Sequence, residues 1–158
     1  MRNGAELSAN RRYRYTLWRT WDPGLPYAMF ICLNPSTADE IRDDPTLRRC
    51  AAYAKAWGYG GVCVTNLFAF RATNPRDMKR AADAVGPEND RYLRAAANGA
   101  GLVVAAWGVH GHHQGRDAEV RAIVRRFHYL KLTSRGQPAH PLYLPKDLKP
   151  TTWRGSHL

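Results

Sequence analysis

The chain has 158 residues, a length that suits one domain with a substantial buried core. Its 24 Lys and Arg residues outnumber its 13 Asp and Glu residues, so the formal net charge at pH 7 is +11. No run of residues approaches the roughly 20 apolar positions of a membrane span, which excludes a transmembrane helix. The amino terminus lacks an apolar signal core, and we therefore expect a cytoplasmic protein without a membrane partner.

The excess of positive charge indicates the kind of partner. Most of the cationic side chains are arginines, which bind phosphate through two parallel hydrogen bonds. A field of this sign attracts polyanions and supplies phosphate binding that does not depend on nucleotide sequence. Nucleic acid is the predicted partner, and a basic protein with solvated charged faces is the alternative.

The first half of the chain contains two predicted strands and one predicted helix. Residues 12–19 combine aromatic, β-branched and arginine side chains, a pattern typical of an edge strand. Residues 27–33 are continuously apolar, as in a strand that is buried on both faces. Pro45 suits the first position of a helix with Asp44 as its N-cap, and the apolar stripe that follows ends at Trp57-Gly58.

Strands and helices also alternate through the second half. Residues 61–70 form the second predicted central strand, 102–106 the third and 129–133 the last. Helices are predicted over 88–98 and 117–127, the latter with an apolar stripe along one face. This alternation predicts an α/β fold, a three-layer αβα sandwich whose central sheet has about four mainly parallel strands.

We expect the whole chain, residues 1–158, to form a single domain that acts as a monomer. It divides into an N-terminal strand or arm (1–26), a core (27–146) and a tail (147–158). The three cysteines are an odd number without the spacing of metal ligands. Reduced and mostly buried thiols are therefore predicted.

Polar residues follow three of the strand-like runs at the point where each run ends. Asn34 follows the first apolar strand, Asn66 follows an apolar stretch of the second, and His140 precedes Pro141 near the end of the chain. Open α/β sheets bind ligands beyond the carboxyl ends of their strands, so we expect the three residues to line one crevice. Two amides and an imidazole suit the recognition of a nucleobase better than they suit redox chemistry or phosphoryl transfer.

These segments, in this order, resemble the motifs of the uracil-DNA glycosylase superfamily. Leu33-Asn34-Pro35 is similar to the first motif of its mismatch-specific branch, and Val64-Thr65-Asn66 to the second motif of its thermophilic branches. Trp107-Gly108 and His140-Pro141-Leu142-Tyr143-Leu144 are similar to its late motifs. The segment Leu33-Asn34-Pro35-Ser36-Thr37-Ala38-Asp39 also resembles a small bacterial and phage family of unknown function. The superfamily resemblance implies a glycosylase-like fold, a base flipped out of DNA into a pocket, and no cofactor.

Three departures from that superfamily shape the expectation. Asn34 replaces the aspartate of the main uracil branch, which puts uracil in doubt and leaves room for a larger base. The four cluster cysteines of the thermophilic branches are missing, so an iron–sulfur cluster is not expected. Residues 109–115 form a loop rich in Gly and His whose spacing matches no recognised metal site, and no metal is predicted. We expect this loop to contact DNA or a bulky substituent on the base.

The resemblance implies a role for each of the three strand-end residues. His140 would donate a hydrogen bond to O2 of the leaving base, although it also reads as a turn residue before proline. Asn34 cannot take up a proton, and its amide can only orient water and bind a base edge. Asn66 carries a donor and an acceptor, enough to read a pyrimidine edge, or it caps a turn.

Further residues complete the predicted site. Asp39, Asp43 and Asp44 are the aspartates near the first motif; Asp39 is the predicted catalytic residue and Asp44 the helix cap. Substrate binding is assigned to Ser36, Ile41, Asn66, Phe68 and Trp107. DNA binding is assigned to Arg71, Arg76, Lys79, Arg80, Tyr143, Leu144 and Lys146. Tyr143 and Leu144 would wedge into the base stack, or equally belong to the core.

The predicted function is that of a monofunctional DNA glycosylase. It would hydrolyse the N-glycosidic bond of a modified or damaged pyrimidine, of the uracil type or a hypermodified phage cytosine, and leave an abasic site. Such an enzyme would serve DNA repair or antiphage defence. The alternative, which the missing aspartate favours, is a non-catalytic module that binds DNA or a modified nucleotide in a glycosylase-like pocket.

Overall fold

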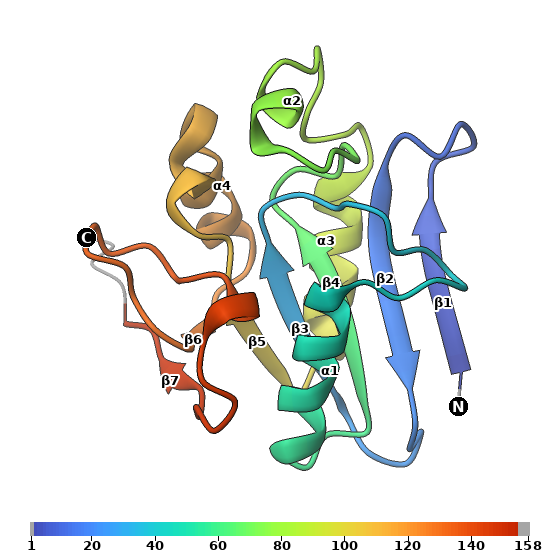
Figure 1. Cartoon of the computed structure of the whole chain (residues 1–158), viewed down its shortest axis with the longest axis vertical. Helices are drawn as coiled ribbons and strands as arrows, with labels where there is room; N and C mark the ends of the chain where they lie inside the picture. The colour runs from blue at the N-terminus through green and yellow to red at the C-terminus, as the bar shows by residue number, and fades with distance from the viewer. Residues whose placement is uncertain (1, 155–158) are drawn as a thin grey trace.

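A computed structural model describes residues 2–154, and the strands in this part of the chain form one mixed sheet. Its order is β1-β2-β4-β3-β5-β6-β7 (Figure 1). The strands are β1 (Arg2–Leu7), β2 (Arg14–Thr20), β3 (Tyr27–Cys32), β4 (Gly61–Asn66), β5 (Leu102–Ala105), β6 (His128–Tyr129) and β7 (Thr151–Thr152). Strands β4, β3, β5 and β6 run parallel to one another, whereas β1, β2 and β7 are antiparallel to their neighbours.

Helices lie on both faces of the sheet, which confirms the predicted α/β class. They are α1 (Pro45–Ala56), α2 (Pro75–Lys79), α3 (Asn89–Gly99) and α4 (Arg116–Ile123), with 3-10 helices η1 (Val109–Gly115) and η2 (Pro141–Tyr143). One core cluster lies under α1 and a second under α3 and α4 (Figure 1). Across residues 2–154, no helix combines the length and apolarity needed to cross a membrane.

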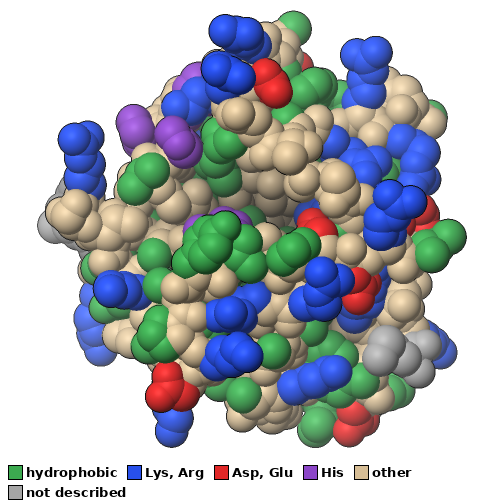
Figure 2. All heavy atoms as spheres, in the orientation of Figure 1, with side chains coloured by type: hydrophobic (Ala, Val, Ile, Leu, Met, Phe, Trp, Pro, Cys, Tyr) green, Lys and Arg blue, Asp and Glu red, His purple; other side chains and the backbone are tan. Residues whose placement is uncertain are grey.

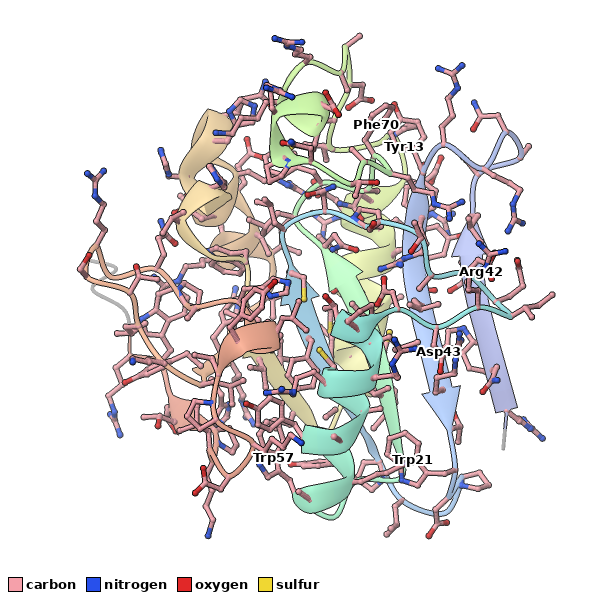
Figure 3. All side chains as sticks on the ribbon, in the orientation of Figure 1. Tyr13, Trp21, Arg42, Asp43, Trp57 and Phe70 are labelled. Atoms are coloured by element: carbon pink, nitrogen blue, oxygen red, sulfur yellow. The ribbon has the colours of Figure 1, made fainter. Side chains whose placement is uncertain are left out.

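The start of α1 follows from two consecutive residues of the sequence. Asp44 Oδ1 accepts the backbone N–H of Leu47 at 2.8 Å, and Pro45 occupies the first turn, where its missing N–H costs nothing. Both features were predicted. At the other end, Trp57 stacks on Tyr53 with ring centroids 5.3 Å apart, and Figure 3 shows it at the lower end of the helix. Trp57 also stacks on Phe30 of β3 with ring centroids 6.0 Å apart, so this end of the helix is held against the sheet.

The prediction of an edge strand over 12–19 was wrong. Strand β2 is an inner strand, because β1 pairs with its outer side and β4 with its inner side. Inside β1, Gly4 makes room for this pairing, since a Cβ at that position would lie 2.1 Å from the ring of Trp18. The arginines of β2 therefore sit within the sheet instead of along a solvated edge.

Other elements end earlier than the sequence pattern suggested. The strand predicted over 61–70 ends at Asn66, after which Leu67 and Phe68 donate to the carbonyls at the end of β3. Helix α4 ends at Ile123, and the last predicted strand is reduced to the two residues of β6. Part of the predicted tail joins the sheet as β7, and Trp153 packs beside it on Phe127.

Candidate functional site

The three predicted strand-end residues line one small pocket at the carboxyl ends of β3 and β4. Asn34, Asn66 and His140 lie around a cavity of about 40 Å³, as the crevice prediction required. Other polar residues of its wall are Arg14, Ser36, Asp44 and Thr46. The parallel register of β3 and β4 pairs Cys32 with Asn66, so both strands deliver polar side chains to the same edge of the sheet.

Asn34 is held in one orientation by backbone carbonyls. Its Nδ2 donates to the carbonyl of Ala72 at 2.7 Å and to that of Pro35 at 3.2 Å. Both donors of the amide are thereby engaged, and Oδ1 is left as an acceptor. Asn34 therefore presents a fixed acceptor that can hold a water molecule but cannot take up its proton.

His140 precedes η2 and uses one ring nitrogen to cap it. Nδ1 lies 3.2 Å from the backbone nitrogen of Leu142 and accepts its hydrogen bond. Burial lowers the pKa of His140 below its usual value of 6.5, and the carboxylate of Asp44 opposes this shift only in part. The ring is therefore neutral at pH 7 with its proton on Nε2, which makes Nε2 a hydrogen-bond donor.

The orientation of Asn66 is set by an arginine that sequence reasoning missed. Arg14 Nη2 lies 3.4 Å from Oδ1 of Asn66, and a guanidinium can only donate. Nδ2 of Asn66 makes no hydrogen bond with a described residue, so the amide offers its donors to the pocket. The signal was an arginine between two tyrosines at the start of β2, in a segment that was predicted to be an edge strand.

The carboxylate in this pocket is Asp44, and the structure does not bring Asp39 into it. Asp39 accepts backbone N–H groups from Ile41 and Arg42 at 2.9 and 2.7 Å, which stabilises its own loop. These hydrogen bonds lower the pKa of Asp39. Asp43 binds the buried guanidinium of Arg19 at 2.9 Å. Asp44 serves as the predicted helix cap, and its second oxygen makes no hydrogen bond with a described residue.

The predicted substrate-binding residues are dispersed. Ser36 lies on the wall of the pocket and also on that of a larger neighbouring hollow. Phe68 and Trp107 are buried in the core, and the indole N–H of Trp107 donates to Gln137 at 2.8 Å. Ile41 is 84% exposed on the loop before α1. Of these residues, Ser36 and Asn66 are the ones that the structure places at the pocket.

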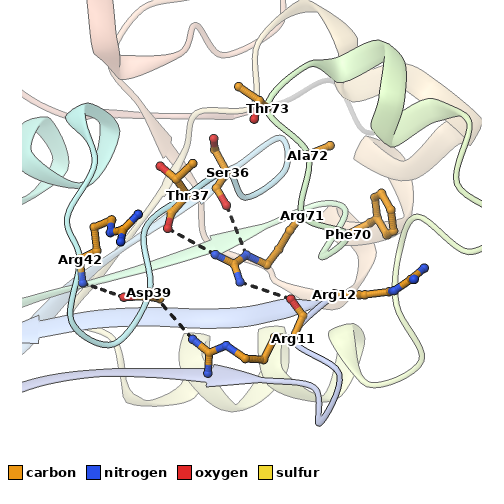
Figure 4. A pocket seen from close by; sticks show the side chains of 10 residues that line it. All are labelled: Arg11, Arg12, Ser36, Thr37, Asp39, Arg42, Phe70, Arg71, Ala72 and Thr73. Carbon is orange, nitrogen blue, oxygen red and sulfur yellow. Dashed lines mark hydrogen bonds and ion pairs between the residues drawn. The ribbon is translucent and has the colours of Figure 1, made fainter.

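The larger hollow, about 490 Å³, adjoins the pocket through Ser36 and is lined by arginines (Figure 4). Arg71 was predicted to contact DNA. Its guanidinium instead donates hydrogen bonds to the carbonyls of Ser36, Thr37 and Arg11, at 3.3 Å each. These hydrogen bonds connect the loop between β1 and β2 with the segment after Asn34. Arg71 therefore shapes the hollow, whereas Arg12 and Arg42 on its wall are exposed.

A second basic hollow, of about 400 Å³, lies at α2. It is lined by Arg76, Lys79 and Arg80, all predicted DNA contacts, together with His110. Lys79 Nζ is 3.0 Å from Nδ1 of His110, and burial followed by this positive charge lowers the pKa of the ring. Figure 2 shows the hollowed face with Lys and Arg side chains on its upper and right-hand rims. The cations on this face would attract a polyanion.

The two predicted wedge residues differ in exposure. Tyr143 is 90% exposed, whereas Leu144 packs against the core under α1, and its carbonyl accepts from Arg49. Lys146 lies exposed beyond them.

In the loop rich in Gly and His, residues 109–115, His112 caps its own turn through Nδ1, which lies 2.8 Å from the Val109 carbonyl. Across the described residues, no three His, Cys, Asp or Glu side chains are placed to hold a metal ion.

A mixed sheet with a polar pocket at the ends of two parallel strands defines an α/β protein whose candidate site lies at the strand ends. A family model described as "Protein of unknown function (DUF1643)" matches residues 14–142, a span that includes every residue lining the pocket. The chain therefore belongs to the DUF1643 family. No curated protein and no solved structure matches it.

Proposed function

We propose that the protein is a DNA glycosylase that removes a pyrimidine-type base and leaves an abasic site. The observation that carries this proposal is the division of the pocket into donors and acceptors. His140 Nε2 and Asn66 Nδ2 are donors, whereas Asn34 Oδ1 and the free oxygen of Asp44 are acceptors. Hydrolysis of an N-glycosidic bond needs both sets, one for the leaving base and one for the attacking water.

The donors would act on the leaving base. When the C1′–N bond breaks, the bonding electron pair leaves with the base, and negative charge develops on its N1 atom and its carbonyl oxygens. A donor that is fixed in place before the reaction stabilises this charge more in the transition state than in the ground state. Neutral His140 is suited to this role because Nδ1 is already occupied by Leu142 and Nε2 keeps its proton.

The acceptors would act on the water. Asn34 Oδ1 orients a water molecule, whose oxygen bonds to C1′ as the base departs. The water must release one proton, and the carboxylate of Asp44 is the acceptor at hand in the pocket. Asp44 thus replaces Asp39 in the proposal, because Asp39 lies in the neighbouring hollow and is bound to its own loop.

The surroundings of the pocket support DNA as the substrate. Exposed cations rim the hollowed face, and the arginine-lined hollow next to Ser36 suits the sugar–phosphate backbone on either side of a flipped nucleotide. The pocket itself, at about 40 Å³, is smaller than the roughly 150 Å³ of a cavity that binds benzene. A base could enter only if the loop between Asn34 and Asp44 opens, and we propose that DNA binding opens it.

A second candidate function, a non-catalytic reader of modified nucleotides, is favoured by one observation. The strand-end position holds Asn34, which cannot accept a proton, and Asp44 is already engaged in capping α1. Such a module would use the same donors to hold a base and would release it unchanged. The likeness to the uracil-DNA glycosylase superfamily belongs to the first candidate and is part of that proposal.

The two candidates are separated by a base-excision assay on the intact protein. Duplexes and single strands carrying uracil, thymine opposite guanine, or a hypermodified cytosine are incubated with excess protein, and abasic sites are then cleaved with alkali. Strand cleavage that disappears in Asn34→Ala and persists in the exposed-loop control His112→Ala supports the glycosylase. Tight binding of one of these substrates without any cleavage supports the reader, and neither binding nor cleavage contradicts both.

A further inference from the structure

Arg14 is a buried cation without an anionic partner. Its side chain belongs to a residue that is 3% exposed, and within residues 2–154 it forms no ion pair. Its Nη1 donates to the carbonyl of Ala38 at 3.2 Å and its Nη2 to Asn66 at 3.4 Å, but Nε is buried with no hydrogen-bond partner. Burial lowers the pKa of Arg14 to about 10, which still leaves the guanidinium charged at pH 7.

Arg116 provides a comparison for Arg14, because it is a buried arginine that has only a structural role. It is 1% exposed, but its guanidinium binds Asp90 at 2.6 Å and Glu119 at 3.1 Å, and its Nε donates to the carbonyl of Leu67 at 2.8 Å. Every nitrogen of Arg116 therefore has a partner. A buried charge that lacks such partners destabilises a fold, so its presence points to a ligand.

The charged and polar groups around Arg14 define what that ligand must offer. Arg14, Nδ2 of Asn66 and Nε2 of His140 all donate, and all three residues line the same cavity. Asp44 is the carboxylate on the wall, and it lies too far from Arg14 to form an ion pair with it. A ligand that presents a donor instead of an acceptor to these three residues would leave some of their N–H groups unpaired, and that costs binding energy, whereas a donor elsewhere on the ligand can pair with Asn34 Oδ1 or Asp44.

We propose that Arg14 is a ligand-binding residue and that it makes this pocket specific for a ligand that presents acceptor oxygens to the guanidinium. Two sources carry this chemistry, namely a small oxyanion such as phosphate and the carbonyl edge of a dioxo base. The inference deepens the proposed function, because it names the edge that would enter the pocket and rests on that function for the case of a base. Binding of the free ligand requires no excision, so the inference is tested separately.

The experiment measures binding to the intact protein by calorimetry and by the backbone and side-chain N–H resonances of ¹⁵N-labelled protein. The probes are inorganic phosphate, free uracil and free cytosine, whose amino group puts a donor where uracil has a carbonyl oxygen. We expect phosphate or uracil to bind with a shift of the Arg14 Nε–H resonance, and cytosine to bind at least about tenfold more weakly than the better of the two. Phosphate binding identifies the oxyanion source, and uracil binding identifies the base.

Variants then separate recognition from folding. Arg14→Met keeps the length of the side chain and removes an unpaired buried charge, so its melting temperature should equal or exceed that of the wild type, while affinity for the bound probe should fall by about tenfold or more. Arg14→Lys keeps the charge but lacks the fork of donors and should show a similar loss. Arg48→Met, a change of an exposed arginine on α1, should leave binding unchanged.

Two results would overturn the inference. One is the absence of binding of both phosphate and uracil at millimolar concentration, or binding of cytosine as strong as theirs. The other is an Arg14→Met protein that binds as the wild type does. If Arg14→Met does not fold, the Nε–H resonance of the wild type decides, since a structural arginine would not respond to the probes. Probe binding without base excision would support this inference and contradict the glycosylase, so the two failures are distinct.

Discussion

The backbone N–H of Leu142 and the Nδ1 atom of His140, 3.2 Å apart, together determine which proton the imidazole carries. Because Nδ1 accepts this bond, the neutral ring keeps its proton on Nε2. The contact is local, between residues two apart, and Pro141 between them favours the turn that creates it. Three consecutive residues, from His140 to Leu142, therefore determine that Nε2 is the hydrogen-bond donor at the pocket.

This relationship leads to the first prediction. Replacing His140 by Ala should lower single-turnover base excision by about 100-fold or more, because a fixed donor to a developing anion contributes at least this much. DNA binding and the melting temperature should change little. The matched control is His112→Ala, which removes an exposed histidine from another loop. A His140→Ala protein that cleaves at the wild-type rate would exclude His140 from the reaction.

A second prediction concerns stability against pH. Burial lowers the pKa of His110, His113 and His140 below the value of 6.5 that they have when unfolded. The unfolded chain therefore binds protons more readily than the folded chain as the pH falls through 6.5. The free energy of unfolding should have its highest value above pH 7 and should decrease as the pH falls from 6.5 to 5. Urea unfolding at pH 7.5 and pH 5 measures this change, and a higher stability at pH 5 would contradict the assignment.

The third prediction separates the two roles of Asp44. Asparagine caps a helix about as well as aspartate, so Asp44→Asn should keep stability to within a few tenths of a kcal/mol, whereas Asp44→Ala should lose about 1 kcal/mol. If the free carboxylate oxygen accepts the proton of water, both variants should lose base excision. Asp39→Asn provides the comparison, since Asp39 lies outside the pocket. Wild-type excision by Asp44→Asn would leave the carboxylate with the capping role alone.

The fourth prediction concerns DNA affinity. The logarithm of the binding constant should fall linearly with the logarithm of salt concentration, because phosphate contacts release counterions. Replacing Arg76, Lys79 and Arg80 together by Ala should weaken binding and make this slope shallower. Replacing the exposed Arg125 and Arg126, which lie beside another hollow at α4's end, removes charge from a different place and should have a smaller effect. Equal effects of the two sets would mean that no particular face binds DNA.

Short sequence patterns predicted those strands and helices that are determined by residues close together in the chain. The apolar run of β3 is recognisable because parallel strands are buried on both faces, and α1 is recognisable because Asp44 and Pro45 mark its start. The convergence of Asn34 and Asn66 was also predictable, since the carboxyl ends of parallel strands meet at one edge, whereas His140 reaches the pocket from the start of η2.

The missed features depend on contacts between distant parts of the chain. Strand β1 has a polar sequence, and its place beside β2 depends on Trp18 packing over Gly4. That pairing turns β2 into an inner strand and buries Arg14 (Figure 1). An arginine in a short sequence window carries no sign of burial, because the walls that bury it come from residues 24 and 52 positions away, Ala38 and Asn66.

The large separations along the chain between the residues of the pocket have a consequence for the synthesis of the protein. The pocket combines Arg14 from the second strand made with His140, which leaves the ribosome after nearly all the other described residues. A partly synthesised chain can pair β2 with β4 and bury its first apolar residues, but it has no imidazole donor. Binding by the full set of donors therefore begins only after His140 has been synthesised, and a nascent chain that ends before this residue cannot bind the ligand with all of them.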